Sequence, residues 1–313
     1  MDRMSNSLAL AASDRLLILA PHPDDESIAT GGLIQVARDA GAATRVLVLT
    51  DGDNNPWPQR WIEKRWHIDA AARSRWGARR REEARTAMHV LGLHADDARF
   101  LGLPDLGLTD LLMRNDQAVI DTLRATVDEF RPTILVAPAL SDRHPDHSAA
   151  HILARLALRA SAITPRLLAF AVHGGVVGDV VLPLNSAQRE TKANAIRAHA
   201  SQVRLSGRRF LRYAAGDETY HDAASIMEDP AHPLRARLCN GVLDISIAPS
   251  AARGLAVFVA LDDGTRVLRA SAPRGSVVTI EAGKAQSGFV KLARPQPGWR
   301  VFDTHGWQAV TRT

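Results

Sequence analysis

The sequence predicts an α/β fold built on a mostly parallel sheet, followed by a small antiparallel β unit. Between residues 14 and about 172, short apolar runs alternate with helical patterns, which is typical of βαβ units. Beyond about Asn240 the pattern changes, because Leu243, Ile245 and Ile247 alternate with polar neighbours, as in half-buried antiparallel strands. We therefore predict a large α/β domain over 1–239 and a β-rich domain of unknown role over 240–313.

Turn and stop signals bound the predicted elements. Gly41, for example, stands where the first helix should end, and glycine favours the left-handed conformation there. In the β unit, Asp263-Gly264 predicts a hairpin turn between strands at 255–261 and 265–270. The strands of the large domain are expected at 16–21, 45–50, 99–103, 133–138 and 166–172. Its helices are expected at 27–40, 79–91, 116–130, 148–161, 187–200 and 201–213.

Composition excludes several classes of protein. Apolar residues make up 46% and charged residues 23% of the 313 residues, which is enough apolar surface for a folded core. No run approaches the roughly 18 apolar residues of a membrane span, and the apolar stretch at 8–12 is too short for a secretory signal. The single cysteine, Cys239, cannot form an internal disulfide. We therefore expect a cytoplasmic protein.

The positive charge does not predict a nucleic-acid partner. The net charge is +5, and residues 60–85 hold nine Lys and Arg against four Asp and Glu. No motif of a DNA- or RNA-binding fold accompanies these charges. A solvated, arginine-rich helix face is the better interpretation.

A histidine and two aspartates follow the first predicted strand directly. The strand runs into Pro21-His22-Pro23-Asp24-Asp25-Glu26, and open α/β sheets bind ligands beyond the carboxyl ends of their strands. His22 and Asp25 can converge on one metal ion across a tight turn, which leaves Asp24 free for proton transfer. Acidic residues also suit the first turn of a helix through its dipole, but that interpretation does not account for His22.

A second cluster, His144-Pro145-Asp146-His147, lies just past the strand predicted at 133–138. Taken alone, it is more readily explained as a pair of surface histidines. Two clusters at equivalent ends of two strands, however, can supply the three ligands and open position of a catalytic zinc site. Nitrogen and oxygen ligands without thiolate also suit Fe²⁺, Co²⁺ or Ni²⁺, and zinc is the first choice.

Both clusters belong to a wider set of motifs that resembles the PIG-L/LmbE-like zinc N-deacetylase family. The matching segments cover about the first two thirds of the chain in the family's order, and the first and fourth are specific in combination. They are PHPDDESIATGG (21–32), RREEARTAMHVLG (80–92), FLGLPDLGL (100–108), HPDH (144–147) and KANAIRAHASQ (192–202). The resemblance implies a Rossmann-like fold, with helices on both faces of a mostly parallel sheet, and one zinc ion per chain.

The resemblance also implies roles for the two clusters. It places His22, Asp25 and His147 on the metal and makes Asp24 the general base. It gives His144 the task of steadying the oxyanion or of protonating the leaving amine.

Three further residues follow from the same resemblance. Asp146 is expected to hold one of the histidines. Arg80 and Asp105 match positions that touch the polar groups of the substrate in sugar-acting relatives. For Arg80 a charge on a helix face, and for Asp105 a turn residue, are equally good interpretations.

These observations predict a zinc-dependent hydrolase that removes an N-acetyl or short N-acyl group from an amino sugar or glycoconjugate. Zinc would polarise the amide and Asp24 would take a proton from water. An amidase for another acyl amide, such as a thiol-sugar conjugate, is the first alternative. A non-catalytic carbohydrate-binding module is the second. The connection at 52–78, which contains Trp57, Trp61, Trp66 and Trp76, suggests an acceptor linked to a lipid or nucleotide, or a packed structural flap.

Overall fold

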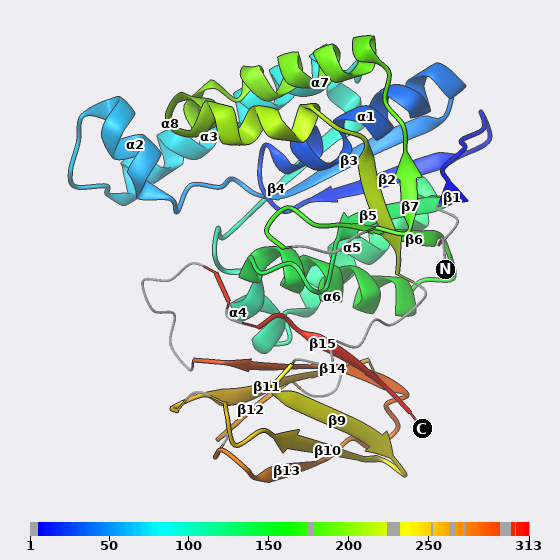
Figure 1. Ribbon diagram of the computed structural model, residues 1–313, viewed down its shortest axis with the longest axis vertical. Helices are drawn as coiled ribbons and strands as arrows, with labels where there is room; N and C mark the ends of the chain where they lie inside the picture. Colours follow the sequence, from blue (N-terminus) through cyan, green and yellow to red (C-terminus); the bar gives the residue numbers. More distant parts are fainter. Residues whose placement is uncertain are drawn as a thin grey trace. The chain divides into compact units, whose positions relative to one another are not determined.

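The computed structural model (Figure 1) describes residues 6–174, 178–223, 232–251, 253–262, 267–271, 273–294, 302–303 and 305–312. The chain forms two compact units, and each consists of more than one segment. Unit 1 comprises Met1–Leu106, Phe130–Pro138 and Thr164–Ala223. Unit 2 comprises Gly107–Glu129, Ala139–Ile163 and Ala224–Thr313.

Unit 1 is built on a sheet whose described strands run in the order β1-β7-β8-β6-β5-β2-β3-β4. The five strands from β6 to β4 are parallel, whereas β8 is antiparallel to both of its neighbours. The strands are β1 (Asn6–Ser7), β2 (Arg15–Ala20), β3 (Ala43–Thr50), β4 (Ala98–Leu103), β5 (Ile134–Pro138), β6 (Arg166–Phe170), β7 (Val180–Leu182) and β8 (Glu218–Asp222).

The helices of unit 1 begin and end at residues suited to those positions. Helix α1 (Asp25–Ala40) ends at Gly41, which is left-handed with φ 75°. Helix α3 (Ala70–Val90) begins after Asp69, whose side chain accepts a hydrogen bond from the backbone N–H of Ala72 at 2.7 Å. The others are α2 (Pro56–Glu63), α7 (Ser186–Ala198) and α8 (Ala200–Leu211).

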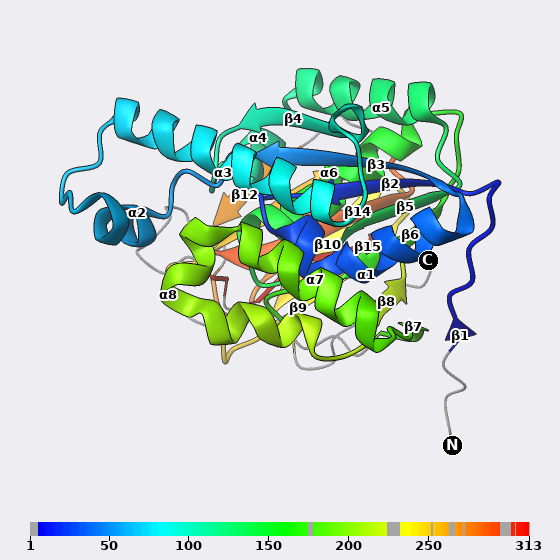
Figure 2. The same cartoon turned by 90° about the horizontal axis from the view of Figure 1, so that it is seen from above.

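One apolar core joins α1, α3 and α7 to the sheet. Leu33 and Ile34 of α1, with Ala87 and Met88 of α3, pack together with the apolar side chains of the central strands. Helix α7 lies beside both α1 and α3 (Figure 2). These three helices therefore form a packed layer against the parallel strands.

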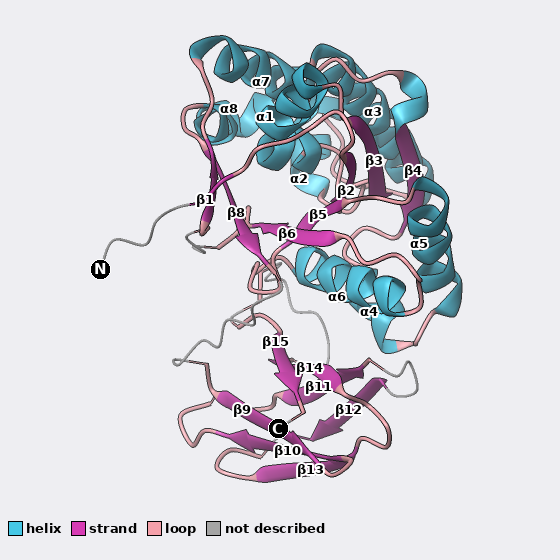
Figure 3. Cartoon of the chain, turned by 90° about the vertical axis from the view of Figure 1, so that its right-hand side faces the viewer, coloured by secondary structure: helices cyan, strands magenta, loops and turns pink. Residues whose placement is uncertain are grey.

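In its described residues, unit 2 combines three helices with two small antiparallel sheets (Figure 3). Apolar residues of both sheets, such as Leu243, Ile245 and Val259, form one core between them. The helices are α4 (Leu108–Met113), α5 (Gln117–Phe130) and α6 (Pro145–Arg159). The strands are β9 (Leu234–Cys239), β10 (Val242–Ile247), β11 (Ala256–Leu261), β12 (Val267–Ser271), β13 (Val277–Glu281), β14 (Ser287–Ala293) and β15 (Gln308–Thr311).

The predicted fold class is confirmed: the structure has a large, mostly parallel sheet flanked by helices, and small antiparallel sheets toward the C-terminus. Helix α3 begins nine residues before the predicted start at 79, because Asp69 caps it. Strand β7 and helix α4 were not predicted, since they have only three and six residues. Strand β8 was also not predicted, and its sequence ETYHD contains a single apolar residue, Tyr220. Strand β9 pairs with β10, so the small sheets begin on the N-terminal side of the predicted boundary at 239/240.

Strands β11 and β12 form the expected antiparallel pair. The predicted Asp263-Gly264 turn between them lies outside the described residues. Among the residues that the structure describes, we find no helix with the length and apolar character needed to cross a membrane.

Candidate active site

The two predicted clusters follow strands that are neighbours in the sheet. Strands β2 and β5 pair in parallel, with Leu16 opposite Ile134 and Ile18 opposite Val136. The chain order reverses between them, since β3 and β4 lie beyond β2 and β6 lies beyond β5. Open α/β sheets bind ligands at such a switch point. His22 follows the end of β2 and His144 the end of β5, so both clusters come from the strands that define this point.

His22 is held between two carboxylates. Its Nδ1 lies 3.2 Å from Asp25 Oδ2 and its Nε2 lies 3.3 Å from Asp105 Oδ1. Asp105 also accepts a hydrogen bond from the backbone N–H of Asn54 at 2.7 Å. Burial would raise the pKa of Asp105, but its hydrogen bonds and the charge of His22 outweigh burial and lower that pKa far below its usual range. Asp105, whose side chain is 6% exposed, is therefore an anion that orients His22.

Asp24 is buried, its side chain pairs with an arginine, and its backbone has an unusual conformation. Its Oδ2 lies 3.1 Å from Nη2 of Arg80, itself only 5% exposed. Burial raises the pKa of Asp24 to about 6, and Arg80 only partly opposes this shift. Its backbone, at φ 141° and ψ −25°, has a conformation that costs an L-residue about 1–3 kcal/mol. Asp24 thus carries local strain that the surroundings must compensate.

The second cluster is ordered by the loop before α6. The Oδ1 of Asp142 accepts a hydrogen bond from the backbone N–H of His144 at 2.9 Å, and its Oδ2 lies 3.1 Å from Nδ1 of His147. Asp142 and His147 are fully buried. A carboxylate on one nitrogen of a histidine is the usual support of a metal ligand, because it fixes the ring and presents the other nitrogen.

His144 is oriented by the backbone of Asp146. The N–H of Asp146 donates to Nδ1 of His144 at 3.2 Å, so the neutral ring of His144 carries its proton on Nε2. The side chain of Asp146 instead accepts a hydrogen bond from the backbone N–H of Leu108 at 3.0 Å. The expectation that Asp146 holds a histidine stays a prediction, and the contact of its backbone N–H with His144 Nδ1 is compatible with it.

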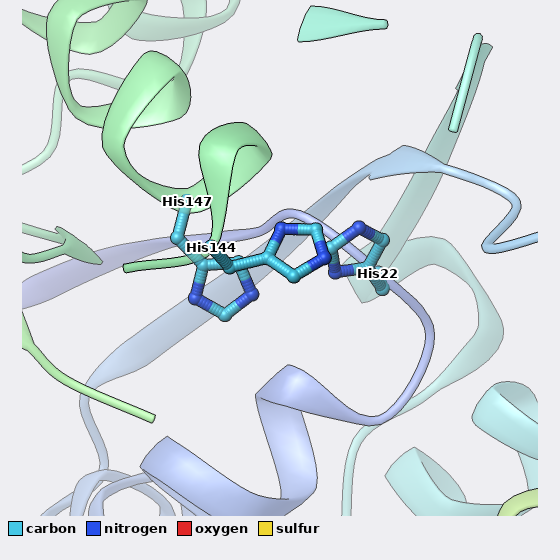
Figure 4. A group of neighbouring side chains, drawn as sticks. All are labelled: His22, His144 and His147. Carbon is cyan, nitrogen blue, oxygen red and sulfur yellow. The ribbon is translucent and has the colours of Figure 1, made fainter. Parts of the chain in front are cut away.

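Within the described part of the chain, two groups of side chains have the spacing to hold a metal ion. One consists of His22, His144 and His147, which are all buried and offer ring nitrogens within 4.8 Å of one another (Figure 4). The other consists of His22, Asp105 and Asp146. The predicted ligands His22 and His147 are thus in one group, and the predicted ligand Asp25 contacts His22 from outside it.

Comparison with known proteins identifies the family. The family model described as PIG-L, GlcNAc-PI de-N-acetylase, matches residues 17–158. A 1D-myo-inositol 2-acetamido-2-deoxy-alpha-D-glucopyranoside deacetylase of Mycolicibacterium vanbaalenii is 30% identical over 239 residues, which cover 70% of this chain and 79% of the relative. The chain belongs to the PIG-L family. This membership confirms the predicted family and the predicted class of enzyme, an N-deacetylase.

A further relative and a solved structure are also similar to this chain. A protein of the same name from Mycobacteroides abscessus is 28% identical and covers 61% of this chain and 82% of its own length. The solved 4-carboxy-2-hydroxymuconate hydratase of Pseudomonas putida KT2440 is 19% identical, with a TM-score of 0.56, and the match covers 70% of this chain and all of that chain. A hydratase shares this fold, so the fold by itself does not determine the reaction.

Two buried residues near the candidate site of this PIG-L family member, Asp142 and Glu26, were not predicted from the sequence. His199 lies in the motif at 192–202, for which reach into the site and a helix-packing role were equally good interpretations. Asp142 comes four residues after β5 and five before His147. This position between a strand end and a candidate ligand could have indicated that it supports His147. Glu26 and His199 are buried and lie 3.0 Å apart. Burial lowers the pKa of His199, but the charge of Glu26 outweighs burial and raises it. That pairing joins residues 173 positions apart, and no local pattern indicates it.

Proposed function

We propose that this PIG-L family member is a metal-dependent N-deacetylase that removes an acetyl or short acyl group from an amino sugar or its conjugate. The relatives named above are deacetylases of an N-acetylated amino sugar joined to inositol, and this supports the class of substrate. The single observation that carries the proposal is the buried group of His22, His144 and His147, with Asp24 two residues from His22. A histidine group with an adjacent carboxylate is suited to the hydrolysis of an amide.

The residues fit a zinc ion as the resident metal. We propose His22, Asp25 and His147 as its ligands. The Asp25 Oδ2 to His22 Nδ1 distance of 3.2 Å is close to the roughly 3.3 Å between adjacent ligands of a tetrahedral zinc ion. The contact of Asp142 with His147 Nδ1 supports metal binding through the other ring nitrogen. When bound, zinc would polarise the amide carbonyl and make water more acidic.

Two side chains are suited to the proton transfers. Asp25 contacts the proposed ligand His22, whereas Asp24 pairs with Arg80. We therefore propose that the carboxylate of Asp24 takes a proton from the attacking water. An amide nitrogen must be protonated before it leaves, because an amide anion is a very poor leaving group. His144, with its proton on Nε2, can donate to that nitrogen or to the developing oxyanion. Water attack and amine departure are thereby given to different residues.

The substrate contacts proposed for Arg80 and Asp105 are supported to different degrees. Asp105 contacts His22 and the loop that contains Asn54, so it is close enough to the proposed metal to meet polar groups of a substrate. Arg80 donates to the carbonyl groups of Pro23 and Gly52 and to Asp24. These bonds favour a role for Arg80 through Asp24.

The tryptophans at 52–78 support a large acceptor. Trp57, Trp61 and Trp66 are 65%, 67% and 82% exposed, whereas Trp76 is 1% exposed. Three exposed indole rings in one segment are not core residues, and such rings pack on sugar rings or lipid. We propose a lipid- or nucleotide-linked amino sugar as the acceptor and a cytoplasmic location for the enzyme.

The function is tested by acetate release. The purified protein, loaded with zinc, is expected to release acetate from N-acetylglucosamine conjugates, with stoichiometric metal measured in the same sample. The panel includes free N-acetylglucosamine, its inositol and nucleotide conjugates, a lipid-linked form and an N-acylated thiol-sugar. Release only from the thiol-sugar would favour the amidase alternative. Tight sugar binding without metal and without release would favour the binding module.

Asp142 provides a test of the metal centre that leaves all proposed ligands intact. Asp142→Asn keeps the shape of the side chain but removes the charge that fixes His147. We expect metal affinity to fall about 10–100-fold, measured by competition with a chromogenic chelator. Asp121→Asn, at an exposed position of α5 in the same unit, is the matched control. Equal affinities in the two variants would exclude a supporting role for Asp142.

A further inference from the structure

The peptide group between Pro23 and Asp24 forms hydrogen bonds on both sides with buried charged side chains. Its N–H donates to Oε2 of Glu26 at 3.0 Å, and its C=O accepts from Nη2 of Arg80 at 2.6 Å. Glu26 is 0% and Arg80 is 5% exposed. A carboxylate on the N–H and a guanidinium on the C=O match the dipole of the peptide, so these two charge-assisted bonds fix the orientation of its plane.

This peptide precedes the strained residue of the site. The φ of 141° at Asp24 lies in a region that L side chains rarely adopt. Such a conformation persists only where the surroundings determine it. The carbonyl of Asp24 accepts from the backbone N–H groups of Ser27 and Ile28 at the start of α1. The peptide before Asp24 and the carbonyl after it are therefore both held.

The Glu26 carboxylate is itself held by a side chain from a distant segment. Oε1 of Glu26 lies 3.0 Å from Nε2 of His199 and accepts a hydrogen bond from Oγ of Ser27 at 3.0 Å. His199 is 1% exposed and lies between α7 and α8. Each carboxylate oxygen of Glu26 thus has its own partners, one in the backbone of Asp24 and the other in His199 and Ser27.

The Arg80 guanidinium is held by a hydrogen bond to the loop after β3. Nη1 of Arg80 donates to the carbonyl of Gly52 at 2.6 Å. Gly52 has a φ of 61°, and a Cβ at this position would lie 1.7 Å from Nη1 of Arg80. Arg80 can occupy its place only because residue 52 has no side chain.

We propose that Glu26, His199 and Arg80 are positioning residues that hold the Pro23–Asp24 peptide, and with it the strained backbone of Asp24, and so fix the Asp24 carboxylate. The inference rests on the proposed function, in which Asp24 is the general base. It assigns a purpose to the second and fifth of the sequence motifs, which supply Arg80 and His199. A general base must lie within hydrogen-bond reach of the proton it takes. The strained backbone of Asp24 determines the position of its carboxylate.

The test is a double-mutant cycle in the full-length, metal-loaded protein. Glu26→Gln keeps the size of the side chain and removes the charge. It is expected to lower kcat about 10- to 100-fold, the effect of a displacement of about 1 Å in an active site, with KM and metal content unchanged. In an Asp24→Asn background the same change should cost less than about twofold, because the group it positions is already inactive. Gly52→Ala, which displaces Arg80 from the other side, should reproduce this pattern.

Glu218→Gln is the matched control. Glu218 is another buried glutamate in contact with α1, where it accepts from the N–H groups of Gly32 and Leu33, and it pairs with Lys192 at 2.6 Å. Its replacement should lower the melting temperature and leave kcat per folded molecule nearly unchanged.

Three results would overturn the inference, and they are distinguishable. Equal losses from Glu26→Gln in both backgrounds would make Glu26 a structural residue only. A normal kcat in folded Glu26→Gln and Gly52→Ala would show that the peptide needs no such support. A normal kcat in Asp24→Asn itself would refute the general base, and with it both the proposed mechanism and the inference. If Glu26→Gln fails to fold, the cycle with Gly52→Ala gives the same decision.

Discussion

Replacement of Asp24 by Asn is expected to lower kcat by about 10²–10⁴-fold while the metal remains bound. Asparagine has nearly the same shape as aspartate but cannot take a proton from water, and a general base contributes a factor of this size. The measurement is kcat from acetate release, with metal content determined on the same preparation. Retained metal would show that the loss is one of proton transfer.

The control for this prediction is Asp39→Asn on α1, the helix that Asp24 precedes. The side chain of Asp39 is 53% exposed and pairs with Arg38, so its replacement should leave kcat unchanged. Near-normal turnover in Asp24→Asn would transfer the role of base to another group. Loss of metal in this variant would instead make Asp24 a ligand.

Replacement of His147 or Asp25 by Ala is expected to remove most of the metal and almost all activity. Each change takes away one of three proposed ligands. The affinity should therefore fall by more than the about 10–100-fold that loss of a supporting residue causes. Metal content after dialysis, measured by atomic emission, is the first readout, and acetate release is the second.

His144→Ala distinguishes the two possible ligand sets. The Nδ1 of His144 accepts from the backbone N–H of Asp146, which favours a ring that carries a proton on Nε2. We therefore expect this variant to keep its metal and to lose kcat more than KM changes. Full metal in Asp25→Ala together with empty His144→Ala would show that the three histidines are the ligands.

Local sequence patterns were sufficient to predict most of the elements and the two clusters. The apolar runs of β2, β3 and β5 and the stop at Gly41 are short-range signals, because burial and helix termination depend on consecutive residues. The positions of His22 and His144 just after two such strands followed directly from those runs. The alternation of Leu243, Ile245 and Ile247 also predicted a strand, and these residues are buried in the core of unit 2.

The surroundings of Asp24 could not be predicted in the same way. Its contact with Arg80 joins residues 56 positions apart, and the contact of Ser27 with His199 joins residues 172 positions apart. Such pairs depend on which helices pack against which strands, and the sequence pattern around each residue is equally compatible with a solvated charge. The interpretation of Arg80 as a helix-face charge failed for this reason, since its side chain is buried.

The sequence by itself therefore determined which residues are the candidates for the chemistry, because a metal ligand or a base is proposed from its functional group and its place at the end of a strand. Only the tertiary structure decided how those groups are held. The strained backbone of Asp24, the buried Glu26–His199 pair and the absence of a side chain at Gly52 are consequences of three distant segments that meet at one peptide. Their arrangement is set by the order of the strands and the packing of α3, α7 and α8, since contacts between distant segments form only when the whole sheet is assembled.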